Sequence, residues 1–261
     1  MRKQMTLTLA LAVAVAGAVV ASTALAALGP TVVGPDGNTQ AIDVKLSPKK
    51  LSRSTGTPAS LKVTTKTTTT TNANGVPSPA VRAVVDFPKG VRLFAKGLPT
   101  CDAGQLQNIS TDQALQLCGD AKIGSGAATA LIPVGAQVFT ENTTVTAFNG
   151  KPQGKKPTVL LHTYGQAPVQ VTLVLNGVIS NYDKQGYGPR LDIGIPLIAG
   201  GTGALTDFQT TINKKFTYKG KKRSFVTAMC ANSPLKSRGA FTFMDGVTLT
   251  AKSQHGCTKK K

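Results

Sequence analysis

The chain contains 261 residues and carries a formal net charge of +19, with 30 Lys and Arg residues against 11 Asp and Glu residues. It holds one glutamate and two histidines, and such a thin supply of carboxylate pairs and imidazoles argues against general acid–base catalysis. We therefore predict that the protein is not an enzyme and has no catalytic residues. With 41% hydrophobic residues, the chain can bury a core of ordinary size.

The first residues have the layout of a secretory signal peptide. Arg2 and Lys3 precede an apolar run at 7–20, which the small-x-small cleavage site Ala24-Leu25-Ala26 follows. This pattern predicts a signal peptide over 1–26 and a secreted product that is extracellular or associated with the cell surface; an uncleaved anchor helix is the alternative. No later apolar run reaches the roughly 20 residues that span a bilayer, so no transmembrane segment is expected after cleavage.

Short runs of β-branched and apolar residues, separated by Gly, Pro, Asn and Asp, fill the rest of the chain, which is typical of an all-β protein. We predict an antiparallel β-sandwich, Ig-like or jelly-roll-like, in a single domain over 27–261, with a weak boundary near 149–157 as the best candidate division. The Asp245-Gly246 pair predicts a type I′ hairpin. The predicted strands are 41–46, 60–65, 81–87, 137–148, 158–164, 169–179, 190–198, 204–216, 225–230, 240–244 and 247–252.

Four cysteines lie beyond the predicted signal peptide, at Cys101, Cys118, Cys230 and Cys257. An even count in an exported chain favours two disulfides. Three pairings are possible, and we favour 101 with 118 and 230 with 257 because each pair brackets a compact segment. No metal site is expected, since the spacing offers no C-x-x-C. Between the first two cysteines, Ser110 followed by Gln113 predicts a short helix inside a disulfide-stapled loop.

Positive charge is concentrated near the C-terminus, where the segment 214–261 holds twelve Lys or Arg residues against one acid, Asp245. Gly220 marks a predicted hairpin tip, and strand alternation would place Phe216 and Tyr218 on one face of this hairpin. A dense positive loop can hold polyanions by direct pairing and counterion release, while a solvated hairpin that aids solubility is the alternative. The predicted anion-binding residues are Lys214, Lys215, Lys219, Lys221, Lys222 and Arg223.

We interpret the chain as a non-enzymatic secreted or cell-surface protein that binds an anionic cell-wall polymer or an acidic glycan through this hairpin and the basic C-terminal tail. No small-molecule cofactor is expected. One alternative is a secreted carbohydrate-active hydrolase or lyase that uses His162, Tyr164 and Asp192, with Asp183 nearby. In that segment, alternation predicts that His162 and Tyr164 share the solvent side of a strand. Another alternative is a purely structural envelope protein.

Several short motifs carry a resemblance to known proteins. They are Phe87-Pro88-Lys89-Gly90, Gly97-Leu98-Pro99-Thr100-Cys101, Cys118 and Ile123-Gly124-Ser125-Gly126-Ala127. Over roughly 80–130 the chain resembles a group of uncharacterised secreted, disulfide-containing β proteins of high-GC Gram-positive bacteria. The resemblance implies export, a bacterial origin and a β fold with disulfides. It transfers no functional residue, because the group has no assigned activity.

Overall fold

The computed structural model describes residues 28–167, 170–231 and 233–260, so the predicted signal peptide lies outside it. Within these ranges the chain is mostly β-structure, with one short α-helix. No helix among the described residues is long and apolar enough to cross a membrane. The elements are β1 (Val32–Val33), β2 (Asn38–Ser47), β3 (Lys50–Leu51), β4 (Thr57–Pro58), β5 (Ser60–Thr69), β6 (Ala80–Pro88), β7 (Arg92–Leu93), η1 (Ala103–Leu106), α1 (Thr111–Cys118), η2 (Gly119–Ala121), β8 (Lys122–Val134), β9 (Gln137–Gln153), β10 (Lys156–Gly165), β11 (Val171–Asn181), β12 (Tyr187–Gly194), η3 (Ala199–Gly201), β13 (Ala204–Ile212), β14 (Lys215–Tyr218), β15 (Lys221–Ser224), β16 (Val226–Ala228), β17 (Leu235–Phe243), β18 (Thr248–His255) and β19 (Thr258–Lys259).

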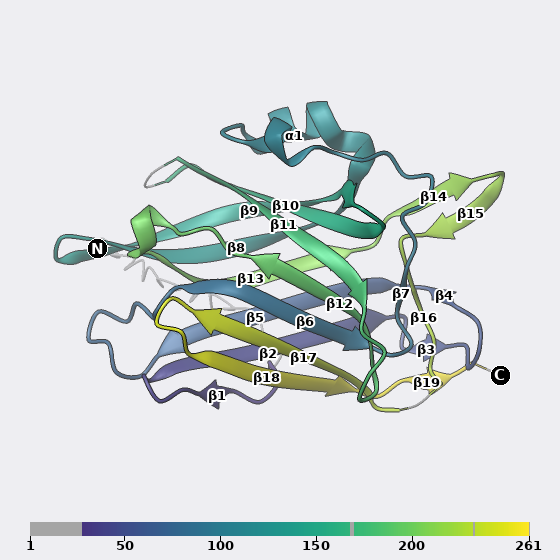
Figure 1. The fold of residues 1–261 in the computed structure, drawn as a ribbon, viewed down its shortest axis with the longest axis horizontal. Helices are drawn as coiled ribbons and strands as arrows, with labels where there is room; N and C mark the ends of the chain where they lie inside the picture. Colours follow the sequence, from purple (N-terminus) through teal and green to yellow (C-terminus); the bar gives the residue numbers. More distant parts are fainter. Residues whose placement is uncertain (1–27, 168–169, 232, 261) are drawn as a thin grey trace, which may run out of the picture.

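Twelve strands form one sheet in the order β1-β2-β5-β13-β8-β9-β10-β11-β12-β6-β17-β18, and all neighbours are antiparallel. The sheet curls until β18 lies against β2 (Figure 1). There, the backbone N–H of Val44 donates to Ser253 at 3.2 Å, and His255 pairs with Asp43. The architecture is thus antiparallel and all-β, but nearly barrel-like and not clearly the predicted sandwich. A wide twisted sheet can bury its apolar face by curling on itself, without a second large sheet.

The two faces of the sheet are buried in different ways. Val159 and Leu161 of β10 point into the curled interior and join the main core. The alternate residues Leu160 and His162 are also buried, because the segment that contains η1, α1 and η2 covers the outer face of β9 and β10 (Figure 1). α1 begins with the predicted capping box, in which Ser110 and Gln113 satisfy each other's backbone N–H groups.

The two disulfides join Cys101 to Cys118 and Cys230 to Cys257, which is the pairing with the short intervening segments. The first closes the loop that carries α1, as the predicted stapled loop requires. The second fixes the C-terminal segment beside β3, where β19 pairs in parallel with it. Each bond therefore holds a short peripheral segment against the sheet.

β8 is a long central strand of the sheet. Its sequence is rich in Gly and Ala, which have low strand propensity. Neighbouring β13 approaches closely here: a Cβ at Gly124 would lie 2.2 Å from the Thr211 carbonyl oxygen, and one at Gly126 would lie 1.9 Å from that of Gln209. The small residues are explained by this close approach, which only the assembled sheet reveals.

The structure also describes the predicted boundary segment at 149–157 and the predicted hairpin turn at Asp245-Gly246. The possible boundary at 149–157 is the β9–β10 hairpin, whose turn contains Gly154 at φ 60°. The β17–β18 hairpin forms as predicted, but the type I′ assignment is wrong, because Gly246 has a positive φ of 87° and Asp245 does not. The backbone N–H of Phe243 bonds to the carbonyl oxygen of Val247, so the turn has three residues and ends in a left-handed glycine.

Candidate anion-binding surface

The predicted basic hairpin exists as β14 and β15, which project from one end of the molecule (Figure 1). Lys219 and Gly220 form its tip with φ values of 50° and 71°, so this two-residue turn has positive φ at both positions. Lys215 and Thr217 are exposed, whereas Phe216 and Tyr218 are half-buried on the other face, which confirms the predicted alternation. Of the six predicted anion-binding side chains, all except the half-buried Lys214 are exposed.

Aromatic packing fixes the hairpin to the body of the protein. Phe94 stacks on Phe216 with 6.0 Å between ring centroids and meets Tyr218 edge-on at 5.9 Å. The guanidinium of Arg223 lies 5.4 Å from the Phe94 ring centroid, within the range of a cation–π contact. Phe94 follows β7, and its backbone N–H donates to the carbonyl oxygen of Phe225 at the base of the hairpin. The positive charges are therefore held on a supported arm.

Gly97 allows Tyr218 to pack against the body, and replacing it with alanine should loosen the hairpin. Its φ is 86°, and an added Cβ would lie 2.1 Å from the Tyr218 ring. We expect Gly97→Ala to lower the free energy of unfolding by about 1–3 kcal/mol, measured by urea unfolding. Gly220→Ala is the control, since Gly220 has a positive φ with open space around it and should cost about 1 kcal/mol or less. Equal losses in the two variants would contradict the role of Gly97.

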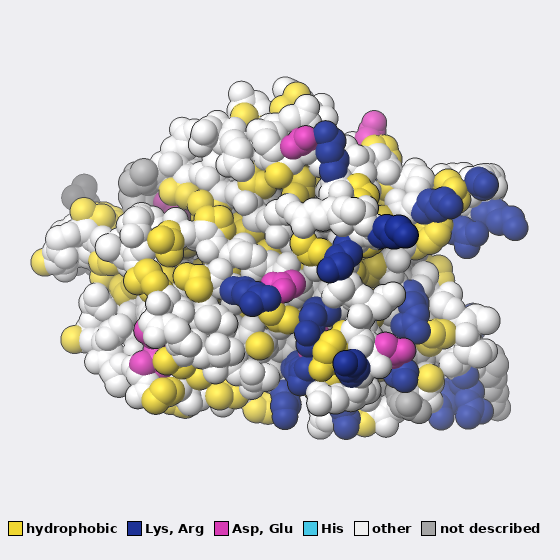
Figure 2. Space-filling model, in the orientation of Figure 1, with side chains coloured by type: hydrophobic (Ala, Val, Ile, Leu, Met, Phe, Trp, Pro, Cys, Tyr) yellow, Lys and Arg dark blue, Asp and Glu magenta, His cyan; other side chains and the backbone are white. Residues whose placement is uncertain are grey.

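Further cations lie at the same end as the hairpin. β19 pairs with β3, and the backbone N–H groups of Thr258 and Lys260 donate to the carbonyl oxygens of Lys49 and Leu51. The strand that follows the hairpin, β16, pairs with β4 and β7. In Figure 2, dark blue side chains gather over this end. We define the cationic end as the six hairpin residues together with Lys49, Lys50, Arg53, Arg92, Lys96, Lys259 and Lys260, all of them exposed except Lys214.

The opposite end of the molecule carries no basic residue in its described turns. These are 34–37, 70–79, 135–136, 166–167 with 170, 195–203 and 244–247, which hold Asp36 and Asp245 but neither Lys nor Arg. Moreover, the ion pairs among the described residues involve none of the side chains of the cationic end. The cationic end is therefore segregated, and its own side chains form no ion pair with any described residue, although Lys89, which lines a groove together with Arg92, is paired with Asp183.

The residues of the hydrolase alternative are not brought together. His162 is fully buried beneath the loop that carries α1, where its Nε2 lies 3.1 Å from the carbonyl oxygen of Ile109, so its predicted place on the solvent side is wrong. Burial lowers the pKa of His162, partly offset by the hydrogen bond to Ile109. Asp192 is occupied by a two-point contact with Arg82, and Asp183 lies 3.6 Å from Lys89. Tyr164, on the same strand as His162, accepts a hydrogen bond from Gln166.

Sequence inspection missed the support of the hairpin and part of its charge. Phe94, Lys96 and Gly97 are distant from the hairpin in the chain. In the sequence, only the aromatic residue Phe94 and the nearby Gly97 indicated a packing site. Lys49, Lys50 and Arg53 formed a visible basic cluster, but nothing local placed them near the C-terminus. Their position depends on the pairing of β19 with β3.

Comparisons with protein-family models, with curated proteins and with solved structures find no match to this chain. Among the described residues, no group of three or more His, Cys, Asp or Glu side chains is arranged to hold a metal ion. The function is therefore inferred from charge, burial and geometry alone.

Proposed function

We propose that this protein is a non-enzymatic, secreted or cell-surface protein that binds an anionic polymer, such as a cell-wall polymer or an acidic glycan, at its cationic end. One observation carries the proposal: positive charge is gathered at one end of the molecule, on side chains that form no ion pair within the described part of the chain, while the described turns of the other end hold no cation. Charge that served solubility alone would favour an even spread over the surface. A one-sided field attracts and orients a polyanion.

The shape of the cationic end favours a polymer over a small anion. The hairpin cations stand on an exposed arm, and a second group lies on the β3 and β19 segments, so no single enclosed pocket collects them. An extended chain of negative groups can contact both, and each contact releases counterions. The aromatic base formed by Phe94, Phe216 and Tyr218 reduces the conformational freedom that binding would otherwise remove.

Reversing the charge of the hairpin tip should abolish most of this binding. We expect the variant with Lys219, Lys221, Lys222 and Arg223 replaced by Glu to bind purified cell walls and heparin at least about tenfold more weakly near physiological salt. Co-sedimentation of residues 27–261 over a salt series measures the effect. Wild-type retention should fall steeply as salt rises, because exposed charges are screened.

The matched control reverses four exposed strand lysines outside the cationic end, namely Lys62, Lys66, Lys236 and Lys252. This control variant has the same net charge as the hairpin variant, so it separates position from total charge. The proposal is overturned by equal binding of the two variants, or by wild-type retention that salt does not change.

A further inference from the structure

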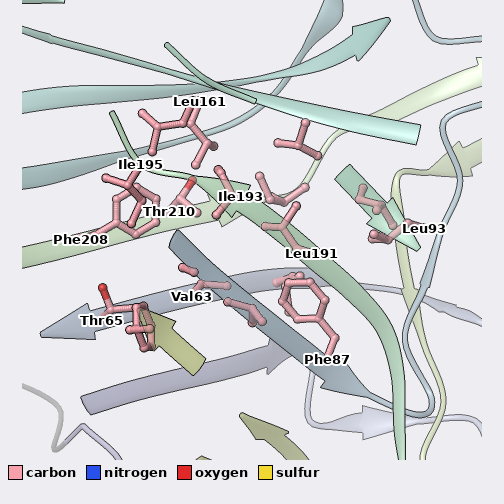
Figure 3. Close-up of a pocket in the computed structure, with 18 of the residues that line it drawn as sticks. Val63, Thr65, Phe87, Leu93, Leu161, Leu191, Ile193, Ile195, Phe208 and Thr210 are labelled. Carbon is pink, nitrogen blue, oxygen red and sulfur yellow. The ribbon is translucent and has the colours of Figure 1, made fainter. Parts of the chain in front are cut away.

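The interior of the curled sheet contains an apolar cavity of about 100 Å³. Figure 3 shows its lining side chains converging from several strands, among them Leu161, Leu191, Ile193 and Phe208. Thr65 and Thr210 are the polar residues among those that line it. For comparison, an engineered apolar cavity of about 150 Å³ stays dry and binds benzene. The interior thus offers space for a small apolar group.

A second void of about 30 Å³ adjoins the first. Four side chains line both, namely Leu175, Ile195, Leu205 and Phe208. Three polar residues, Glu141, Thr143 and Thr163, are among those that line the smaller void. The two voids are therefore neighbours that share apolar lining residues, and Glu141 lies at the wall of the smaller one.

Glu141 is buried without a hydrogen-bonding partner. The residue is 1% exposed, and neither carboxyl oxygen is hydrogen-bonded to any of the described residues. The other buried carboxyl groups are satisfied, since Asp43 contacts Lys45 and His255, and Asp86 contacts two arginines. A buried carboxyl group without a partner is costly, so a native structure that keeps one calls for a specific reason.

The surroundings of Glu141 leave room for its carboxyl group. A Cβ at Gly165 would lie 2.0 Å from Oε1 of Glu141, so a larger residue there would collide with it. Gly165 and Thr163 face the interior from β10, beside Thr143 of β9. Glu141 thus lines the smaller void, with its carboxyl group packed over Gly165.

We propose that the two voids form one binding site for a small amphiphile, with its alkyl chain in the apolar cavity and a hydrogen-bond-donating end group, an ammonium or a hydroxyl, against Glu141. A wholly apolar ligand would leave the carboxyl group unsatisfied, and an anionic end group would be repelled by it. Together the two voids are slightly smaller than the engineered cavity that binds six-carbon benzene, so the alkyl chain can hold at most about six carbon atoms. The site is separate from the cationic end, so it stands or falls independently of polymer binding.

The test is calorimetric titration of residues 27–261 with hexylamine, hexanol, hexanoate and hexane. Hexylamine and hexanol should bind, and hexanoate should bind at least about tenfold more weakly than hexylamine, because its carboxylate meets Glu141. A stronger response to hexylamine than to hexanol would identify an ammonium end group, and the reverse a hydroxyl. Failure of both to bind, or binding of hexanoate or hexane as strong as theirs, overturns the proposal.

Two variants locate the site. Glu141→Gln keeps the side-chain volume and should weaken hexylamine binding about tenfold or more. Asp207→Asn changes an exposed carboxylate and should leave that binding unchanged. Leu175→Phe narrows both voids and should weaken hexylamine and hexanol alike; its unfolding temperature shows whether the fold survives, and if it does not, the Glu141→Gln result decides. Equal effects of Glu141→Gln and Asp207→Asn would also overturn the proposal.

Discussion

Replacing Asp86 with asparagine should lower the free energy of unfolding by about 3–5 kcal/mol, since it leaves two arginines without their buried counter-ion. Asp86 is 1% exposed on β6. Its Oδ1 accepts from Nε of Arg190 at 2.6 Å, and its Oδ2 accepts from Nε of Arg238 at 2.6 Å. The two arginines come from β12 and β17, the strands on either side of β6. One carboxylate thus links three neighbouring strands.

Tyr182 extends this contact. The guanidinium carbon of Arg190 lies 3.8 Å from the centroid of the Tyr182 ring, and Arg238 donates a hydrogen bond to the Tyr182 hydroxyl at 3.0 Å. Both arginines are therefore held in place by a further partner, and an unpaired charge cannot readily turn to solvent. This constraint is why we expect the full cost of removing one partner from a buried ion pair.

The same contact should make stability depend on acidity. Burial raises the pKa of Asp86, but hydrogen bonds and charge from Arg190 and Arg238 lower it by a larger amount. The pKa of Asp86 therefore lies below the ordinary value. The stabilisation is fully present above the unfolded pKa of about 3.9 and is lost as the pH falls through the lowered folded pKa. Urea unfolding at decreasing pH should show a smaller loss in Asp86→Asn than in the wild type.

The control for this prediction is the exposed pair of Arg82 and Asp192, which lies on the same two strands, β6 and β12. Solvent screens this pair, so Asp192→Asn should cost far less than Asp86→Asn. Comparable losses in the two variants at neutral pH would show that burial does not set the strength of the Asp86 contact.

Removing the disulfide between Cys230 and Cys257 should lower the free energy of unfolding by about 3–4 kcal/mol in the chain-entropy model. Serine at both positions also releases the segment that carries β19 from its place beside β3. Lys259 and Lys260 would then no longer be held at the cationic end, and we expect heparin binding to weaken a few-fold. Urea unfolding and heparin titration measure the two effects.

The disulfide between Cys101 and Cys118 provides the comparison. Serine at Cys101 and Cys118 should cost about 3 kcal/mol, because its loop is somewhat shorter, while it frees no residue of the cationic end. Heparin affinity should therefore stay at the wild-type value under conditions where the variant remains folded. Weakened binding in both variants, or in neither, would contradict a specific role for the C-terminal segment.

The hairpin and most strands were predictable because their signals are local. Alternating apolar and polar residues predict strands at 81–87 and 158–164, which lie within β6 and β10. A glycine between lysines marks the tip of the β14–β15 hairpin. Glu141 also carried a usable signal. Glu141 is separated from Val145 and Ala147 by an even number of positions, and both of those residues face the core. Because alternate residues of a strand share a face, this spacing alone would have placed Glu141 inside.

The sequence by itself determined the β class, the positive charge, the candidate disulfide cysteines and the basic hairpin, since composition and short-range spacing control these features. Only the tertiary structure decided that the sheet curls on itself, that the Gly- and Ala-rich β8 lies at its centre, and that His162 is covered on the outer face. It also brought residues 49–53 to the C-terminus and enclosed Glu141 beside a cavity. These outcomes depend on pairing between strands far apart in the chain, and local sequence patterns do not encode which strands meet.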